Sequence, residues 1–305
     1  MIPAAAREAL EETLGDRVRF RFPLARCTSL RVGGPVDALA TPETREEIAR
    51  TLAICAAHRI PHCVIGAGFN TLALDDRFEC VALQLGRLRR LEERPDGCLR
   101  VEAGVTHSQL TNFCIERGLA GLEFGCGIPG TVGGWLSMNA GIPGRELKDV
   151  VQEIEVISPT GRGVRHIPRA ELRFVYRALR GLAPGSVILS ALLSVTLSNT
   201  GAVRAEVDRL LAARQKTQPL NVPSCGSVFK NPPGDFAGRL VEAAGLKGRR
   251  LGGAEISAVH ANFIANRGGA TAADVLALIR EAQAAVWQTA GKRLVPEVRV
   301  IGDKP

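Results

Sequence analysis

The spacing of hydrophobic residues predicts a chain of mixed helices and strands. An amphipathic helix is expected over residues 3–15, because Ala6, Leu10 and Leu14 recur on one helical face and Gly15 follows them. The patterns of the rest of the chain favour both strands and further helices, as in an α+β fold.

A strand–helix–strand unit follows the first helix. Its first strand is expected at Val36–Ala40. The hydroxyl of Thr41 and the ring of Pro42, at the first helical position, predict a helix that runs to about His58. The strand Cys63–Ile65 completes the unit.

Other hydrophobic runs predict strands at Cys80–Leu85, Leu99–Glu102, Val151–Ser158 and Val187–Leu197. Helical spacing and end signals predict helices at Ser108–Arg117, Ala202–Lys216, Phe236–Ala244 and from a capping box, Thr271–Asp274, to about Thr289. The composition changes after Asn199, which indicates a domain boundary just before the helix at 202.

The last strand is expected at Val295–Ile301, where polar and apolar residues alternate. Val298 and Val300 point to one side of such a strand, and Glu297 and Arg299 point to the other. Glu297 can therefore face a cleft while the valines are buried.

Two glycine-rich stretches are candidates for phosphate binding. One covers residues 66–75 and follows a predicted strand directly; the other covers residues 122–144 and is long and apolar. Glycine lets the backbone approach another group closely, and successive N–H groups can then converge on a phosphate. Ordinary tight turns are the alternative for each stretch taken alone.

The run Gly125-Cys-Gly127-Ile-Pro-Gly130 also matches the spacing of a dinucleotide-binding fingerprint. That fingerprint requires a preceding strand and a helix that opens at its last glycine. Pro129 removes a donor inside the motif, and the pair at 133–134 disfavours a helix start. A doubly wound nucleotide-binding fold is therefore not expected.

Composition narrows the class of protein. The 305 residues are 46% hydrophobic and 23% charged, which is typical of a globular chain of about two domains. No apolar run reaches membrane-spanning length and no signal peptide is recognisable, so we expect a cytoplasmic protein without a membrane partner. The eight scattered cysteines indicate reduced, mostly buried thiols, and no metal-ligand motif is present.

The net charge of +8 leaves several interpretations open. Basic clusters at 87–90 and 247–250 could bind nucleic acid, could serve phosphorylated small molecules, or could form a solvated surface. Aromatic residues are only 4% of the chain, so stacking platforms for single strands are scarce.

Seven motifs occur in a fixed order: RVGGP at 31–35, GAGFN at 66–70, GIPGTVGG with MNAG at 127–141, YR at 176–177, GSVFKNP at 226–232, GGAEIS with HANF at 252–263, and PEVR at 296–299. Together they resemble the UDP-N-acetylenolpyruvoylglucosamine reductase family, from about Thr28 to Gly302. The short connection from 177 to Ser227 resembles the type II branch of that family.

The resemblance implies an α+β fold, with a two-part FAD-binding region of the PCMH/vanillyl-alcohol-oxidase type before an α+β substrate-binding domain. The expected domains are an N-terminal helix at 1–21, the FAD-binding region at 22–198 and the substrate-binding domain at 199–305. The FAD-binding region would consist of two subdomains, at about 22–86 and 87–198.

The resemblance also implies the reaction. NADPH would reduce UDP-N-acetylglucosamine enolpyruvate to UDP-N-acetylmuramate through FAD, in peptidoglycan precursor biosynthesis. These small molecules would be the partners, with no nucleic acid, no membrane and no metal; the oligomeric state stays open. The implied FAD-binding residues are Gly66, Ala67, Gly68, Phe69, Asn70, Gly127, Ile128, Gly130, Thr131, Gly133, Gly134, Asn139, Ala140 and Gly141.

Three residues match the family's catalytic positions. Arg177 can grip a carboxylate with two hydrogen bonds and stays charged as negative charge builds. Ser227 would donate the proton, and Glu297 would bind the substrate carboxyl region or polarise the enol ether. Tyr176, Lys230 and Asn231 are the implied substrate-binding residues.

Three positions depart from the family pattern. Phe69 replaces a small hydroxyl residue, Leu179 replaces a serine, and Thr217 stands where a lysine is common, with Lys216 one position away. A reductase that binds FAD but turns over poorly is therefore one alternative. Another flavoenzyme of the same FAD-binding superfamily and a basic nucleic-acid binder are the others.

Overall fold

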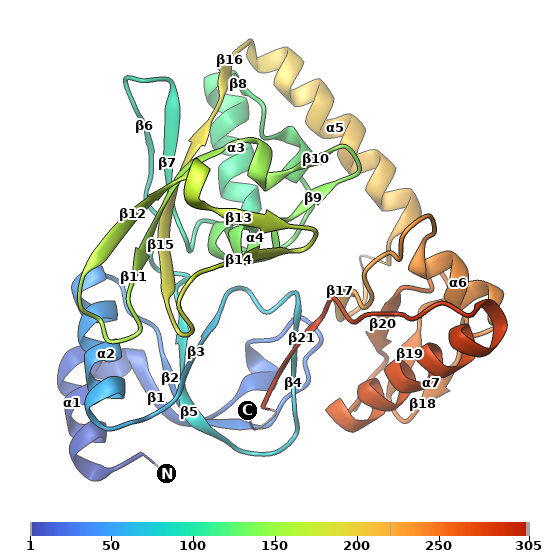
Figure 1. Ribbon diagram of the computed structural model, residues 1–305, viewed down its shortest axis with the longest axis horizontal. Coiled ribbons are helices and arrows are strands. Elements are labelled where there is room, and N and C mark those ends of the chain that lie inside the picture. Colours follow the sequence, from blue (N-terminus) through green and yellow to red (C-terminus); the bar gives the residue numbers. More distant parts are fainter. Residues whose placement is uncertain (1, 220, 303–305) are drawn as a thin grey trace. The chain divides into compact units, whose positions relative to one another are not determined.

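The computed structural model describes residues 2–219 and 221–302, which form two compact units (Figure 1). The first unit contains the chain up to Arg21, Asp37–Ala67 and Glu79–Ala213. The second unit contains Phe22–Val36, Gly68–Phe78 and the chain from Arg214 onward. The predicted domains were continuous in sequence and included residues 1, 220 and 303–305, which lie outside the described part; that assignment stays a prediction.

A four-stranded sheet in the N-terminal part has the strand order β1-β2-β5-β3. Its strands are β1 (Val18–Pro23), β2 (Pro35–Ala40), β5 (Phe78–Gln84) and β3 (His62–Ile65). Helices α1 (Ala4–Leu14) and α2 (Arg45–Ala57) contact one another. The predicted face of α1 is confirmed, because Ala6, Leu10 and Leu14 are buried.

The predicted start of α2 is wrong by three residues. The hydroxyl of Thr44, not of Thr41, caps the helix by accepting a hydrogen bond from the backbone N of Glu47. Thr41 is engaged elsewhere, since its backbone N and its hydroxyl both donate to the carbonyl of Arg17. Because the hydroxyl of Thr41 contacts Arg17, the hydroxyl of Thr44 serves as the helix cap instead.

A five-stranded antiparallel sheet forms the centre of the first unit. Its order is β12 (Val164–Pro168), β11 (Val151–Ile157), β15 (Val187–Ser194), β7 (Cys98–Glu102) and β6 (Leu91–Glu93). Helix α3 (His107–Arg117) lies beyond β7 in the chain, and α4 (Val132–Met138) contacts β15 and β7. The predicted strand Val187–Leu197 is in fact two, because β16 (Thr196–Leu197) separates from β15 to pair with β8 (Leu119–Ala120).

Two short hairpins complete this unit. They are β9 (Gly141–Ile142) with β10 (Arg145–Glu146), and β13 (Arg173–Val175) with β14 (Ala178–Arg180). Short 3₁₀ helices lie at Gly15–Arg17, Leu24–Arg26, Glu123–Gly125, Leu147–Asp149 and Arg169–Glu171.

Helix α4 corrects one of the sequence-based arguments. It begins at Val132, so the prediction that the glycine pair at 133–134 disfavours a helix start is wrong. A Cβ atom at Gly133 would lie 3.0 Å from the Cβ of Ala103, and the backbone N of Gly133 donates to the carbonyl of Ala103 at 2.9 Å. Close packing on the strand end therefore outweighs the low helix propensity of glycine.

The second unit has a four-stranded sheet covered by helices. The strand order is β17 (Ser224–Ser227), β20 (Phe263–Asn266), β19 (Ala254–Ile256) and β18 (Arg250–Leu251). Helix α7 (Ala272–Ala290) contacts β18, β19 and α6 (Ala237–Ala243), and its predicted capping box at Thr271 is confirmed. Helix α5 (Thr200–Thr217) precedes this sheet and agrees with the prediction within two residues.

The last strand is shorter than predicted. Strand β21 (Arg299–Ile301) pairs in parallel with β4 (Thr71–Ala73), whereas Pro296 forms only an isolated bridge with Phe229. Proline lacks the N–H that a continuous ladder requires. The alternation itself is confirmed, because Val298 is buried and Val300 packs on the same core, while Glu297 is only half-buried.

The basic clusters are largely paired with carboxylates. Arg87 pairs with Glu43, Lys247 with Glu242 at 2.7 Å, and Arg249 with Glu281 at 2.8 Å. Surface ion pairs of this kind add little to the stability of the fold. Their carboxylates also partly neutralise the positive charges that a nucleic-acid site would need for binding phosphates. Over the described residues, no helix is long and apolar enough to cross a membrane, and no cluster of metal-ligating side chains occurs.

Asp75 ties the 68–78 segment to helix α7 and provides a test of the second unit. Its carboxylate accepts hydrogen bonds from the backbone N of Ala272 and Ala273, at 2.9 and 3.0 Å. We expect Asp75→Ala to lower the free energy of unfolding by about 1–2 kcal/mol, because two helix N-terminal donors lose their acceptor. Urea unfolding measures the change, with exposed Asp76→Ala as the control; equal effects of the two substitutions would contradict this role.

Candidate active site

The second glycine-rich stretch is held against the strand ends of the first unit. Thr131 forms an isolated antiparallel bridge with Thr106, and the backbone N of Val132 donates to the carbonyl of Val105 at 2.9 Å. A Cβ atom at Gly66, in the first stretch, would lie 3.0 Å from the hydroxyl of Thr131. The two stretches therefore meet at Gly66 and Thr131, as expected if both serve one ligand.

Trp135 supplies a buried donor at this place. The indole ring packs so closely on Gly125 that a Cβ atom there would lie 2.6 Å from Cη2 of Trp135. The Nε1 atom lies 3.8 Å from the position that a Cβ atom of Gly130 would take. Within residues 2–219 and 221–302, this Nε1 is the buried side-chain polar atom that lacks a hydrogen-bond partner. An unpaired buried donor costs about 1–3 kcal/mol, which an acceptor on a bound ligand would remove. The stretch thus fits an anion such as a pyrophosphate.

Asn139 ends helix α4 and joins three segments. Its backbone is left-handed, with φ 43°, and its side chain is fully buried. The amide nitrogen donates to Oε2 of Glu146 at 2.8 Å and to the carbonyl of Val175 at 3.2 Å, while the amide oxygen accepts from the backbone N of Lys148 at 3.0 Å. A residue proposed from the sequence for FAD binding therefore also contacts the β13–β14 hairpin next to its loop.

Arg177 lies at the tip of that hairpin. Tyr176 and Arg177 form a two-residue loop between the paired Val175 and Ala178, and Arg177 has φ 57°. Glycine or asparagine normally occupies such a left-handed position, and another residue costs about 1–2 kcal/mol there. Residues kept in strained conformations concentrate at functional sites, so this backbone favours a role for the Arg177 side chain.

The guanidinium of Arg177 is held on several sides. Its Nη2 donates to the carbonyl of Gly141 at 3.3 Å, its Nη1 lies 3.7 Å from Oε1 of Glu146, and its Cζ lies 4.9 Å from the centre of the Tyr176 ring. The Arg177 side chain is 19% exposed, so a ligand can still reach it. Tyr176 is more open, at 44%.

The Gly68–Asn70 part of the first stretch belongs to the second unit. Gly68 has φ 72°, and a Cβ atom there would lie 2.0 Å from the carbonyl oxygen of Cys27. Ser29 links this loop to strand β17, because its backbone N donates to the carbonyl of Gly68 and its hydroxyl donates to the carbonyl of Ser224 at 2.6 Å. Only glycine fits at this crossing of two backbone segments.

Ser227 and Glu297 lie in the same part of the second unit. Ser227 ends β17, and the backbone N of Glu297 donates to the carbonyl of the next residue, Val228, at 2.7 Å. The side-chain amide of Asn70 donates to the carbonyl of Glu297 at 3.1 Å. The structure therefore brings Asn70 together with Ser227 and Glu297, which follow it in the sequence by more than 150 residues.

Three further residues, Asn262, Cys225 and His260, belong to the surroundings of this cluster. Asn262 clamps Phe229 by donating to its carbonyl at 2.8 Å and accepting from its N at 2.9 Å, which fixes the strand that carries Ser227. Burial raises the pKa of the Cys225 thiol to about 12, so this thiol stays neutral beside the site. Burial also lowers the pKa of His260, which favours its neutral form.

The two implied substrate-binding residues that follow Ser227 are placed differently. The side-chain oxygen of Asn231 accepts from the backbone N of Ala237, at the start of α6, so this residue has a structural partner. Lys230 donates its backbone N to the carbonyl of Val295 at 2.9 Å. Each assignment to substrate stays a prediction.

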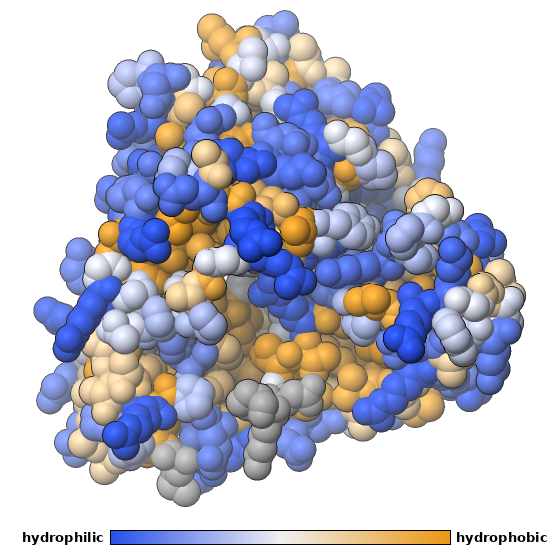
Figure 2. All heavy atoms as spheres, in the orientation of Figure 1, coloured by the Kyte–Doolittle hydropathy of each residue, from blue (hydrophilic) through white to orange (hydrophobic). Residues whose placement is uncertain are grey.

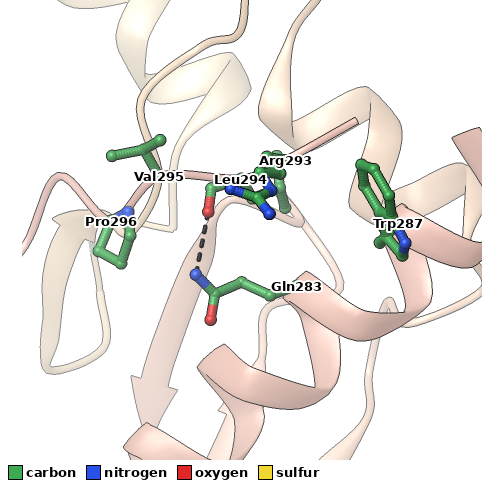
Figure 3. Close-up of a pocket in the computed structure, with 6 residues that line it drawn as sticks. All are labelled: Gln283, Trp287, Arg293, Leu294, Val295 and Pro296. Atoms are coloured by element: carbon green, nitrogen blue, oxygen red, sulfur yellow. Dashed lines mark hydrogen bonds between the residues drawn. The ribbon is translucent and has the colours of Figure 1, made fainter. Parts of the chain in front are cut away.

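A cavity of about 510 Å³ lies beside Val295 (Figure 3). Gln283 and Trp287 of helix α7 face the segment that follows it, and the Gln283 amide donates to the carbonyl of Leu294 at 2.9 Å (Figure 3). The lining residues are Gln283, Trp287, Arg293, Leu294, Val295 and Pro296. This cavity holds none of the implied catalytic residues and is distinct from the cluster of Ser227 and Glu297.

The three departures from the family pattern have clear environments. Phe69 is 38% exposed, Leu179 packs against the core of the first unit, and the hydroxyl of Thr217 donates to the carbonyl of Arg214 within α5. Hydrophilic and hydrophobic side chains are interspersed on the face of the molecule in Figure 2. Single exposed hydrophobic residues such as Phe69 are common on protein surfaces. None of the three displaces Arg177, Ser227 or Glu297.

Sequence reasoning missed several residues that position the site. Glu146, Asn262, Ser29 and Trp135 act through contacts that depend on tertiary structure. Two of them carried a signal, because Asn262 lies within the HANF motif and Trp135 lies within the stretch 122–144, but no role was assigned to either.

Comparisons with known proteins define the class and then the family. A model of an FAD binding domain matches residues 36–166, so the chain is a flavoprotein of that class. The C-terminal domain of UDP-N-acetylenolpyruvoylglucosamine reductase matches residues 218–301. Proteins of that name from Geobacter sulfurreducens and Geotalea uraniireducens are 44% and 40% identical, over 99% and 97% of this chain and 98% of each relative.

A solved structure agrees with these matches. The enzyme of that family (MurB) from Thermus caldophilus superposes with a TM-score of 0.79 at 35% identity, over 93% of this chain and 97% of the solved one. The chain belongs to the UDP-N-acetylenolpyruvoylglucosamine reductase family. The predicted family and the predicted fold, an FAD-binding region followed by a family-specific C-terminal domain, are confirmed; the type II branch stays a prediction.

Gly68 provides a test of the first glycine-rich stretch, for which FAD binding is predicted. We expect Gly68→Ala to weaken FAD binding about tenfold or more. The substitution should also lower the free energy of unfolding by about 1–3 kcal/mol beyond the cost of the left-handed backbone, because the new Cβ atom would meet a backbone carbonyl. Flavin fluorescence titration and thermal unfolding measure the two effects. The matched control is Gly97→Ala, which has a similar φ of 76° but no heavy atom within 4 Å of its Cβ position. Equal behaviour of the two variants would show that the close approach at Gly68 is unimportant.

Proposed function

We propose that this chain reduces UDP-N-acetylglucosamine enolpyruvate to UDP-N-acetylmuramate, with NADPH as reductant and FAD as cofactor, in peptidoglycan precursor biosynthesis. The observation that carries the proposal is the similarity to reductases of this name over nearly the whole chain. The cytoplasm as location, the type II branch and a C-terminal substrate-binding domain from about residue 199 belong to the same proposal.

FAD, when bound, would supply the hydride chemistry that links NADPH oxidation to reduction of the enolpyruvyl ether. The two glycine-rich stretches, with glycines at 66, 68, 130 and 133, would bind its pyrophosphate through converging backbone N–H groups. The indole N–H of Trp135 is a further donor for a bound anion.

Arg177 binds the substrate carboxylate. Hydride addition to the methylene carbon leaves enolate-like negative charge on the adjacent carbon and the carboxylate. A guanidinium interacts more strongly as that charge grows, so it lowers the barrier rather than only binding the substrate. The strained loop at Arg177 holds the group in advance of the reaction.

Ser227 donates the proton that completes the lactyl ether. Its hydroxyl is a weak acid, but an enolate-like carbon is a strong base, so transfer is feasible in good geometry. Glu297, whose backbone is tied to Val228 and Asn70, binds the carboxyl region of the substrate or polarises the enol ether. Lys230, Asn231 and Tyr176 contribute contacts to the substrate.

A spectroscopic titration tests the function as a whole. The purified protein is expected to be yellow, to bleach anaerobically with NADPH, and to regain its colour when UDP-N-acetylglucosamine enolpyruvate is added. A flavin that bleaches but is not reoxidised by this substrate would indicate another flavoenzyme or a degenerate reductase. A protein that cannot be loaded with FAD would overturn the proposal, and a salt-dependent gel shift would then test nucleic-acid binding.

Ser227 can be tested by separating the two half-reactions. We expect Ser227→Ala to leave flavin reduction by NADPH unchanged and to slow reoxidation by the enolpyruvyl substrate about 10²- to 10⁴-fold, because only the second half-reaction needs the proton. Stopped-flow absorbance measures both steps. Ser224→Ala, in the same strand, is the control. A Ser227→Ala enzyme with normal reoxidation would exclude Ser227 as the donor.

A further inference from the structure

The carboxylate of Glu146 lies at the centre of a polar network around Arg177. Its Oε1 faces Nη1 of Arg177 at 3.7 Å, and its Oε2 accepts from the amide of Asn139 and binds Nζ of Lys148, each at 2.8 Å. The Glu146 carboxylate also caps the short helix Leu147–Asp149. The side chain is only 15% exposed, and both of its oxygens are engaged, so its orientation is fixed.

Arg177 needs such support. A guanidinium at the end of a flexible side chain must be ordered before it can bind a carboxylate efficiently, and its own loop is only two residues long. The hydrogen bond of Arg177 to the carbonyl of Gly141, at 3.3 Å, is long. Glu146 adds a charged partner that stands on a different segment, strand β10, which pairs with Gly141.

Glu146 also connects Arg177 to the FAD-binding stretch. Asn139, at the end of α4, binds Glu146 and the carbonyl of Val175, which directly precedes the loop of Arg177. Lys148 pairs with the same carboxylate, and its hydrogen bond with Glu146 raises the pKa of Lys148. Asn139, Glu146 and Arg177 therefore form a continuous path from the end of helix α4 to the hairpin tip.

We propose that Glu146 is a positioning residue for Arg177: it orients the guanidinium for the substrate carboxylate and couples that orientation to the stretch that holds FAD. This inference rests on the proposed function, because it presumes that Arg177 binds the carboxylate. The alternative is that Glu146 only caps the short helix and stabilises the fold.

The central variant is Glu146→Gln, which keeps the size of the side chain and an acceptor for Asn139 but removes the charge. We expect flavin reduction by NADPH to stay normal, while reoxidation by UDP-N-acetylglucosamine enolpyruvate slows about 10- to 100-fold, as misplacement of a catalytic group does. Glu153→Gln is the matched control, because Glu153 also pairs with an arginine, Arg100, at 3.6 Å. Equal slowing of both half-reactions, or no slowing, would overturn the proposal.

A double-mutant cycle then tests whether Glu146 acts through Arg177. In an Arg177→Ala background, Glu146→Gln is expected to cause no further slowing of reoxidation. A full additional loss would mean that Glu146 acts independently, and the proposal would be wrong.

A chemical measurement separates this inference from the proposed function. Phenylglyoxal modification, read by peptide mass spectrometry, reports how firmly Arg177 is held and requires no substrate. We expect the rate at Arg177 to rise several-fold in Glu146→Gln and to stay unchanged in Glu153→Gln. If Arg177 becomes more reactive but the wild-type flavin is never reoxidised by the enolpyruvyl substrate, the function fails while the positioning role stands. An unchanged rate at Arg177 in Glu146→Gln would overturn the positioning role.

Discussion

Close contact between backbone segments is the constraint on which the candidate active site depends. Gly68 crosses Cys27, Gly133 rests on Ala103, and a Cβ atom at Gly141 would lie 2.3 Å from the carbonyl of Arg145. Each contact brings two backbone segments closer together than a side chain would allow. The glycines are thus required by tertiary geometry, and helix α4 forms in spite of them because the packing on Ala103 compensates.

The periodic parts of the chain could be predicted from the sequence, whereas features that depend on distant contacts could not. The buried face of α1, the capping box at Thr271 and the alternation around Glu297 are local, and all were predicted correctly. The start of α2 at Thr44 was not predicted, because Arg17 takes the hydroxyl of Thr41.

The same limit applies to the site. Motif resemblance suggested Arg177, Ser227 and Glu297, since each lies in a recognisable run of residues. No role was predicted for Glu146 or Asn262, because each matters through the segments that it joins. Glu146 joins β10 to the β13–β14 hairpin. Asn262 joins the HANF loop to the chain that follows the strand of Ser227. The left-handed backbone of Arg177 is equally invisible in the sequence, because arginine has no preference for that conformation.

The discontinuous make-up of the second unit has a consequence for how the protein is made. Its core contains Leu30, Val32 and Leu72 from the first quarter of the chain together with Val275 and Leu278 from helix α7. A ribosome delivers the first group long before the second, so these early apolar side chains have no native partners while most of the polypeptide is synthesised. The core of this unit can therefore be completed only after helix α7 has been synthesised, near the end of translation.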